Sequence, residues 1–328
     1  MDTLSDVLKA VRLKGAVFFL VDAYSPFAAE APPAQLVAAS VMPGSEHVIG
    51  FHVITEGTCW GYLIDGEAIR LEAGDVIVFP HGDPHVVASA PGMRADPDLA
   101  GHQVVPEIQL RFSYCYNGGG SEKTSVVCGF LGCDARPFNP LLVTLPRVIH
   151  VRNDAEVGNG WLSQFIHFAV HESSNKQAGG ECILARLSEL MFGEVVRRYL
   201  ASLPPEQPGW LAGLRDRFVG RALALLHERP AQAWTLHDLA REVGLSRSAL
   251  AERFTHFVGQ PPMQYLTQWR MQLAAGLLAR GTANMATVAM ELGYESEAAF
   301  NRSFKKLTGF PPATWRKRQT QQGLAAAG

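Results

Sequence analysis

Three histidines in the first hundred residues are candidates for metal or ligand binding. His81 and His85 lie four residues apart in a turn-rich stretch, and His47 stands just before an apolar, β-prone run. A functional metal centre needs at least three convergent protein ligands and an open position. The three histidines could form such a site. Alternatively, they end turns or line a pocket without holding a metal.

The remaining reactive side chains form no recognisable catalytic set. Glu56 and Glu67 could act as general bases, but neither has an identifiable partner. The five cysteines are odd in number and include no CxxC pair, which argues against a disulfide framework or a zinc knuckle. We expect them to be small buried residues, and only Cys128 and Cys133 are close enough to consider for redox sensing. The sequence therefore predicts no enzyme and no required cofactor.

Charge is divided unevenly along the chain of 328 residues. The formal net charge is only −2, yet the segment from Asp216 to the end carries 14 basic and 8 acidic residues. The preceding 215 residues carry 15 basic and 23 acidic residues. Opposite signs in the two segments indicate a polyanionic partner for the basic one.

The two segments also differ in their hydrophobic patterns. From about residue 15 to 150, short β-prone runs alternate with turns, and Asp65-Gly66 between two such runs predicts a hairpin. Apolar residues then recur at helical spacing near 160–172 and 180–202. A proline-rich linker follows at about 203–209, and the rest of the chain is predicted to be helical. The first ten residues are not a secretory signal and no apolar stretch could span a bilayer, so we expect a cytoplasmic protein.

An internal repeat is the most informative feature of the basic segment. Residues suited to a helix cap, to buried core positions and to a helix stop recur at an offset of 50 residues. The matched pairs are Ser246 and Ser296, Leu250 and Phe300, Phe254 and Phe304, and Gly259 and Gly309. In each unit a short helix ends at a glycine, a serine caps a second helix, and two apolar residues four apart face the core. This layout predicts two helix-turn-helix units, at about 236–257 and 285–307.

A helix at about 262–280 is predicted to join the two units. Its 18 residues span ~27 Å at 1.5 Å per residue. Two recognition helices held at this separation could enter successive major-groove segments, ~34 Å apart, on one face of a duplex. The alternative is a helical bundle with repeated hairpins, which explains neither the glycine-x-serine turns nor the basic balance.

The basic segment resembles the AraC/XylS family of bacterial transcription regulators. The resemblance covers about 220–318 and includes the motifs Trp234-Thr-Leu-His-Asp-Leu-Ala and Gly244-Leu-Ser-Arg-Ser-Ala-Leu. It implies a seven-helix domain in which the second helix of each helix-turn-helix unit lies in the major groove. The residues that the resemblance places on DNA are Arg247, Ser248, Ala251, Glu252 and Thr255 in the first unit, and Glu297, Ala298, Asn301, Arg302 and Lys305 in the second.

The acidic segment resembles the cupin-type regulatory domain that is fused to many members of the same family. The match rests on the spacing Gly-x5-Pro-x-Gly-x2-His, which begins at Gly74 and ends at His85. Cupin enzymes hold a metal with two histidines and a glutamate from a first motif and a histidine from this second one. The first motif is broken here, because Gly50 occupies the glutamate position. The resemblance thus implies a small-molecule effector in the barrel more strongly than a metal.

We therefore predict an α+β multidomain protein. Residues 1–203 form a cupin-like sensor and dimerisation domain, with a β-barrel at about 15–150 and two helices at about 158–203. Residues 204–215 form a linker, and residues 216–320 form an all-α module with two helix-turn-helix units. The expected function is sequence-specific DNA binding that regulates transcription under the control of a small molecule.

The predicted partners are double-stranded DNA, RNA polymerase, the effector and a second copy of the chain. Helices that follow the cupin domain often dimerise in this family, and the apolar residues expected at that contact are Trp161, Phe165, Leu187 and Met191. Two rival hypotheses stay open at this point. One is a cupin metalloenzyme with an accessory helical module, and the other is a helical module that binds proteins instead of DNA.

The charge division gives a first test. The fragment 216–318 should bind duplex DNA with an affinity that falls steeply as salt rises, because phosphate neutralisation releases counterions. A salt titration of the fragment in a gel-shift assay measures this dependence. A folded fragment without salt-sensitive binding would contradict the DNA-binding hypothesis.

Overall fold

Ten strands, most of them rich in β-branched or aromatic residues, are described between Lys14 and Val151. They are β1 (Lys14–Tyr24), β2 (Ala28–Ala31), β3 (His47–Glu56), β4 (Thr58–Leu63), β5 (Ile69–Glu72), β6 (Val76–Phe79), β7 (His85–Ala88), β8 (Phe112–Asn117), β9 (Lys123–Cys133) and β10 (Ile149–Val151). A six-stranded sheet has the order β10-β6-β3-β9-β1-β8, and a four-stranded sheet has the order β2-β7-β4-β5. The pairs are antiparallel except for β1 with β8, which is parallel.

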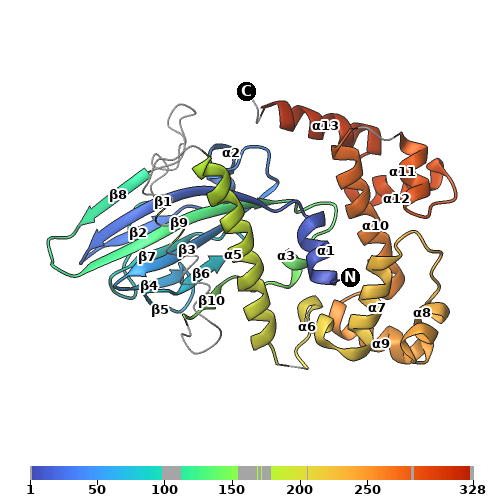
Figure 1. The fold of residues 1–328 in the computed structure, drawn as a ribbon, viewed down its shortest axis with the longest axis horizontal. Helices are drawn as coiled ribbons and strands as arrows, with labels where there is room; N and C mark the ends of the chain where they lie inside the picture. Colours follow the sequence, from blue (N-terminus) through green and yellow to red (C-terminus); the bar gives the residue numbers. More distant parts are fainter. Residues whose placement is uncertain are drawn as a thin grey trace. The chain divides into compact units, whose positions relative to one another are not determined.

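This computed structural model describes residues 2–97, 112–153, 168, 171, 179–204, 206–281 and 284–325 (Figure 1). The chain forms two units with separate cores. The β unit comprises Leu13–Cys133 and Leu145–Tyr199, and the helical unit comprises Met1–Arg12, Asp134–Thr144 and Leu200–Gly328. Two segments that lie before residue 203, Met1–Arg12 and Asp134–Thr144, thus belong to the helical unit, a grouping that no sequence pattern predicted.

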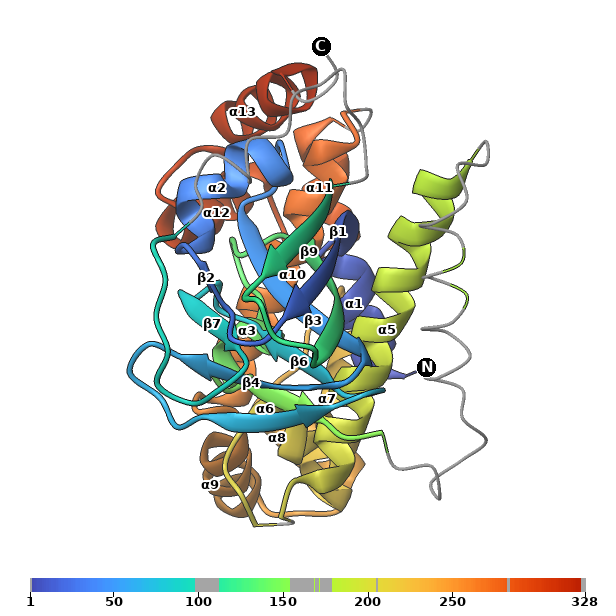
Figure 2. The same ribbon diagram turned by 90° about the vertical axis from the view of Figure 1, so that its left-hand side faces the viewer.

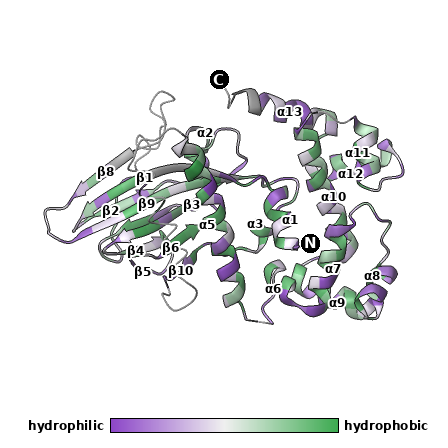
Figure 3. Ribbon diagram, in the orientation of Figure 1, coloured by the Kyte–Doolittle hydropathy of each residue, from purple (hydrophilic) through white to green (hydrophobic). Residues whose placement is uncertain are grey.

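The two sheets of the β unit pack against each other through one shared apolar core. Ala23 and Ile54 of the six-stranded sheet and Leu71 of the four-stranded sheet are fully buried within it. Figure 3 shows the strands largely in the green of hydrophobic residues. The predicted class, a β-rich domain followed by an all-α module, is confirmed. The described strands of the predicted cupin-like barrel form two packed sheets that do not close into one.

Local sequence signals correctly locate the turns of the β unit. The Asp65-Gly66 dipeptide lies between β4 and β5, which pair antiparallel as the hairpin signal predicts. Helix α2 (Ala34–Val41) contacts β3, and its Val37 and Val41 are buried against the sheet. Helix α5 (Gly180–Ser202) runs along the sheets in both views (Figures 1 and 2). It lies so close to β1 that a Cβ atom at Gly15 would collide with the backbone of Ala185.

The helical unit contains ten described helices. They are α1 (Thr3–Ala10), α3 (Pro140–Thr144), α6 (Trp210–Arg215), α7 (Arg217–Glu228), α8 (Leu236–Val243), α9 (Arg247–Val258), α10 (Pro262–Ala279), α11 (Met285–Glu291), α12 (Glu297–Thr308) and α13 (Pro312–Ala325). Helices α8 and α9 form the first predicted helix-turn-helix unit, and α11 and α12 form the second. Helix α10 is the predicted connecting helix.

The caps of both units have the predicted conformations. Gly244 adopts a left-handed conformation with φ of 78° at the end of α8, and Gly293 has φ of 74° in the matching turn. Left-handed backbone is readily available only to glycine, which accounts for both residues. The Ser246 hydroxyl accepts a hydrogen bond from the Ala249 amide at 3.2 Å. The Ser296 hydroxyl does the same for the Ala299 amide, also at 3.2 Å.

A buried polar triad lies in the core beside the first helix-turn-helix unit. The Tyr265 hydroxyl of α10 accepts from Trp210 Nε1 at 2.9 Å and lies 2.7 Å from His227 Nε2 of α7. Burial lowers the pKa of His227 to about 3, so its ring is neutral. The polar atoms of Trp210 and Tyr265 are thereby hydrogen-bonded inside an apolar core, whereas Nδ1 of His227 is buried without a hydrogen-bond partner.

Asp216 anchors the first reading helix, α9, to α7. Its carboxylate caps α7 by accepting from the amides of Phe218 and Val219, and it also accepts from Arg253 of α9 at 3.0 Å. Burial would raise the pKa of Asp216, but the Arg253 guanidinium and the two amides lower it below its ordinary value. Because the folded-state pKa is depressed, the stabilisation is present above the unfolded pKa of ~3.9 and is lost as the pH falls through the folded-state value.

Asp216→Asn should therefore destabilise the protein at pH 7 but not at low pH. Asparagine still caps the helix, so the loss of about 1–2 kcal/mol reports the charged pair with Arg253. Denaturant unfolding of wild type and variant from pH 7 down to pH 2.5 should show the difference shrinking as Asp216 protonates. Glu242→Gln, at an exposed position of α8, is the matched control. An equal difference at both ends of the pH range would contradict the assignment.

Candidate functional site

A cavity of about 230 Å³ lies among the strands of the β unit. Residues from both sheets form its walls. Several of them are alanines or glycines, whose small side chains leave the space unfilled. The lining residues are Val21, Phe27, Ala28, Ala29, Glu30, Ala31, Gly50, His52, His85, Val87, Ala95, Asp96, Tyr114, Tyr116, Val126, Cys128, Gly129 and Phe130. A mainly apolar cavity with a few polar groups is the usual form of a small-molecule site.

Two histidines form the main polar feature of the cavity wall. His52 Nε2 and His85 Nε2 lie 2.7 Å apart, and His85 Nδ1 lies 2.9 Å from the carbonyl oxygen of Asp83. A carbonyl oxygen only accepts, so Nδ1 of His85 carries a proton. In the neutral pair, His52 Nε2 therefore donates to His85 Nε2. The Phe79 ring stacks on His85 with centroids 3.7 Å apart, which fixes the orientation of the pair.

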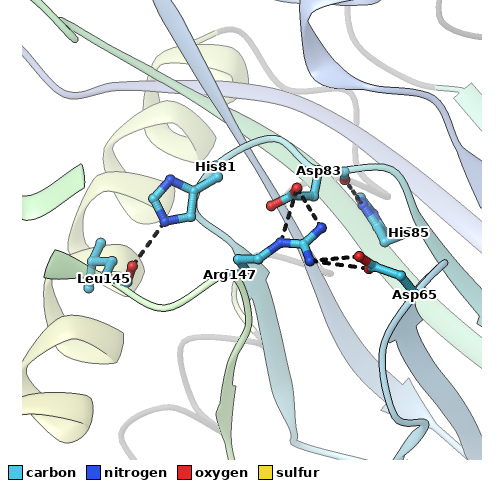
Figure 4. A network of polar contacts seen from close by, with 6 residues as sticks. All are labelled: Asp65, His81, Asp83, His85, Leu145 and Arg147. Atoms are coloured by element: carbon cyan, nitrogen blue, oxygen red, sulfur yellow. Dashed lines mark hydrogen bonds and ion pairs between the residues drawn. The ribbon is translucent and has the colours of Figure 1, made fainter. Parts of the chain in front are cut away.

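The structure does not bring the three predicted histidines together. His85 lines the cavity, but the Nε2 atom of His47 lies 2.7 Å from the Pro80 carbonyl and that of His81 lies 2.9 Å from the Leu145 carbonyl. Figure 4 shows His81 turned toward Leu145 while His85 contacts the Asp83 backbone. Burial lowers the pKa of His47, which keeps its ring neutral. No group of three or more potential metal ligands gathers anywhere in the described part of the chain.

The cupin metal site is therefore not matched by the residues present here. Two of the three candidate imidazoles are committed to backbone carbonyls, and His85 is paired with His52. His52 was not among the predicted site residues, because it is offset from the spacing of the cupin metal motif. The alternation of side chains along a strand was a usable signal for His52. Residues two apart on β3 point to the same face, and both Gly50 and His52 line the cavity.

A network of surface ion pairs lies next to the second cupin motif, which ends at His85. The Arg147 guanidinium donates to Asp65 at 2.9 Å and to Asp83 at 2.9 Å (Figure 4). The hydrogen bond from Arg147 lowers the pKa of Asp65. Arg147 thereby ties the β4–β5 turn to the Asp83 backbone that holds His85.

Among the described residues that line the cavity, the charged side chains are carboxylates. Glu30 and Asp96 line it, and Glu30 accepts two hydrogen bonds from Arg94, at 2.7 and 2.8 Å. The hydrogen bond from Arg94 lowers the pKa of Glu30, which is therefore ionised and neutralised by its partner. The described lining includes no lysine or arginine, so it offers an anionic ligand no direct counter-charge.

The cysteine pair does not have the geometry of a redox switch. Cys128 and Cys133 both lie on the continuous strand β9. Five residues of extended strand separate them by roughly 16 Å, well beyond disulfide reach. Burial raises the pKa of Cys128, and it raises the pKa of Cys59 to about 12. These two thiols are therefore protonated and poorly reactive at neutral pH.

The predicted DNA-contacting residues lie mainly on exposed faces of α9 and α12. On α9, Arg247, Ser248, Glu252 and Thr255 are exposed and Ala251 is half-buried. The buried side of the same helix carries Leu250 and Phe254, both fully inaccessible. Whether these exposed residues contact DNA stays a prediction, but the helix presents them away from its core.

Helix α12 presents its predicted residues in the same way. Glu297, Ala298, Arg302 and Lys305 are exposed and Asn301 is half-buried, while Phe300 and Phe304 fill the core. Four of these residues share one surface hollow with the start of α11 and the start of α13. The hollow is lined by Met285, Glu297, Asn301, Arg302, Lys305, Pro311, Pro312 and Ala313.

Only part of the predicted dimer surface can be assessed. Trp161 and Phe165 lie outside the described residues. Leu187 of α5 is half-buried, but Met191 is only 1% exposed and packs inside the protein, so it cannot face a partner. The inward stripe of α5 includes Leu184 and Met191, and the outward apolar positions are Ile183 and Leu190, which are 39% and 58% exposed.

Comparisons with known proteins agree with this architecture. Residues 2–201 match the cupin family model, and residues 239–318 match a helix-turn-helix domain model. An AraC-like transcription regulator of Streptomyces lividans is 32% identical over 98% of this chain and 99% of its own. One from Streptomyces antibioticus is 31% identical over 97% of this chain and 99% of its own. The solved DNA-binding transcriptional dual regulator from Escherichia coli K-12 is 28% identical, covers 33% of this chain and 96% of its own, and has a TM-score of 0.31.

The chain belongs to the AraC-like transcription regulators. Its C-terminal helix-turn-helix domain is the DNA-binding domain, and its N-terminal part is a cupin domain. Within the described residues, no helix is both long and apolar enough to cross a membrane.

The histidine geometry predicts the metal content of the protein. Purified without chelators, it should hold far less than one metal ion per chain, because His47 and His81 do not converge with His85. His85→Ala should leave that content unchanged in elemental analysis, as should His237→Ala on the exposed side of α8. One zinc or iron per chain that is lost only in His85→Ala would overturn this expectation.

Proposed function

We propose that this protein regulates transcription by reading one face of a DNA duplex with α9 and α12, and that α12 discriminates more strongly between bases. The observation that carries the proposal is the duplicated, equally capped unit whose two second helices bury their phenylalanines and expose polar faces. The 18-residue helix α10 joins the two units and suits successive major-groove segments.

The side chains of α12 are better suited to base recognition than those of α9. Asn301 can pair with adenine N6 and N7, and the exposed Arg302 can bind guanine O6 and N7 or a phosphate. On α9, Ser248 and Thr255 are short, and Glu252 can accept from cytosine but repels phosphate. Arg253 is held by Asp216, so it supports the helix instead of reaching DNA.

We also propose that a small molecule binds in the cavity of the β unit and controls this DNA binding. The volume of about 230 Å³ fits a compact ligand, and the apolar walls favour one with a mainly apolar surface. The His52–His85 pair adds polar atoms to the wall, and the described lining holds Glu30 and Asp96 but no lysine or arginine, which disfavours an anion. The described chain gathers no group of three or more potential metal ligands there, so metal-dependent catalysis is not part of the proposal.

The remaining partners follow from the same architecture. A second copy is proposed to pack on the outward apolar positions of α5, where Ile183, Leu187 and Leu190 lie at helical spacing. Paired half-sites on DNA would suit such a dimer. RNA polymerase is the proposed target of the bound regulator, and the cytoplasm, where promoter DNA is found in bacteria, is the proposed location.

Two substitutions test the assignment of the reading helices. Arg302→Ala should cost about 1–3 kcal/mol of specific operator binding, because it removes a contact to a base edge or phosphate. Glu252→Ala should leave operator binding intact or strengthen non-specific binding, because it removes a carboxylate near phosphates. Both variants are titrated on an operator located by genome-wide mapping and on random duplex, at one salt concentration.

Ala251→Ser is the matched control and should change affinity little. If Arg302→Ala binds the operator like wild type while Glu252→Ala does not bind, α12 is not the stronger reader. If wild-type protein itself prefers no genomic sequence over random duplex, the proposed function fails as a whole.

A further inference from the structure

A single buried side chain on α10 holds two segments that come from the N-terminal part of the chain. Gln272 is 1% exposed, and its Nε2 donates to the Ala10 carbonyl at 2.9 Å. Its Oε1 accepts from the Phe138 amide at 3.1 Å. The amide group thus links the end of α1, the segment before α3 and the helix that joins both helix-turn-helix units.

A second set of bonds ties the same two segments to each other. The Arg12 guanidinium donates to both carboxylate oxygens of Asp134, at 2.6 and 2.9 Å, and the Asp134 amide donates to the Val11 carbonyl at 2.8 Å. Arg12 also donates to Gln319 of α13 at 3.1 Å. Bidentate arginine–carboxylate pairs are geometrically specific, so the two segments are held in a fixed relation.

Apolar packing fixes the segments in the helical unit. Leu4, Val7 and Val11 are buried, and α1 contacts α7 and α10. The Phe138 ring meets the Tyr265 ring edge-on, with centroids 5.4 Å apart. Tyr265 belongs to the buried triad beside the first helix-turn-helix unit, so the docked segments reach into the core of the DNA-binding domain.

The same two segments continue directly into strands that line the cavity. Val11 and Arg12 precede β1, Asp134 follows β9, and these strands pair antiparallel with Lys14 opposite Gly132. Val21 of β1 and Val126 of β9 both line the cavity. A ligand that displaces β1 or β9 would therefore pull on the segments that directly precede or follow these strands. Those segments carry the Ala10 carbonyl and the Phe138 amide that are bonded to Gln272.

We propose that Gln272 is a positioning residue through which occupancy of the cavity changes the arrangement of α9 and α12. This inference rests on the proposed function of the cavity and the reading helices. Its hydrogen bonds to both segments make α10 sensitive to where those segments lie, and α10 sets the spacing of the two units. Coupling of this kind between two sites typically changes affinity about 5- to 150-fold.

A double-mutant cycle in the full-length protein tests the inference without knowledge of the effector. Val21→Phe places a larger side chain in the cavity and so mimics a bound ligand. Ala29→Leu on β2 is a second substitution of the same kind. Gln272→Met keeps the side-chain volume and removes both hydrogen bonds. Gln268→Met, on the same helix but bonded to Gln260, is the matched control. Operator affinity is measured for each single and double variant, and thermal unfolding confirms that each is folded.

We expect at least one cavity-filling variant to change operator affinity about fivefold or more. That change should disappear in the Gln272→Met background and persist in the Gln268→Met background. Hydrogen exchange at the Phe138 amide should be faster in the Gln272→Met single variant than in wild type, and unchanged in Gln268→Met. A filling effect of equal size in the Gln272→Met background would overturn the inference, as would folded filling variants that both bind like wild type. If the wild-type protein shows no preference for the operator over random duplex, the proposed function fails instead. If exchange at the Phe138 amide is as slow in Gln272→Met as in wild type, the hydrogen bond from that amide to Gln272 is not present and the inference is overturned.

Discussion

The β unit depends on strand β9, which is hydrogen-bonded along both of its edges. It pairs with β1 from Lys14 to Tyr24 on one side and with β3 from His47 to Glu56 on the other. These two ladders fix which residues face the second sheet, because a shift of one residue would turn every side chain to the opposite face. The positions of Val21, His52 and Cys128 around one cavity follow from that register.

Features that depend on neighbouring residues could be predicted from the sequence. The helix-turn-helix units depend on a glycine in left-handed conformation, a serine cap and an apolar pair four residues apart, and each is a local requirement. Gly244, Ser246 and Phe254 have the predicted roles. The Asp65-Gly66 hairpin was predictable for the same reason, since the turn alone selects the pairing of β4 and β5.

Features that depend on distant pairing could not be predicted in the same way. His85 meets His52, 33 residues earlier, because β3 and β7 lie in different sheets that pack together. The burial of Met191 depends on which face of α5 meets the sheets, and its helical spacing alone fits either face. The docking of α1 left no sequence signal at all, because Gln272 resembles any polar residue of an amphipathic helix. Its burial arises from partners 262 and 134 residues away.

The separation between α1 and α10 also constrains when the protein can be completed during synthesis. Helix α1 leaves the ribosome first, yet the residue that binds its last carbonyl is made 262 residues later. At about 5–20 residues per second this interval is roughly 13–50 s. The partner helices of α1 begin only at residues 217 (α7) and 262 (α10), whereas the last described strand of the β unit ends at Val151. The β unit can therefore fold first, and the helical unit reaches its final core only when nearly the whole chain exists.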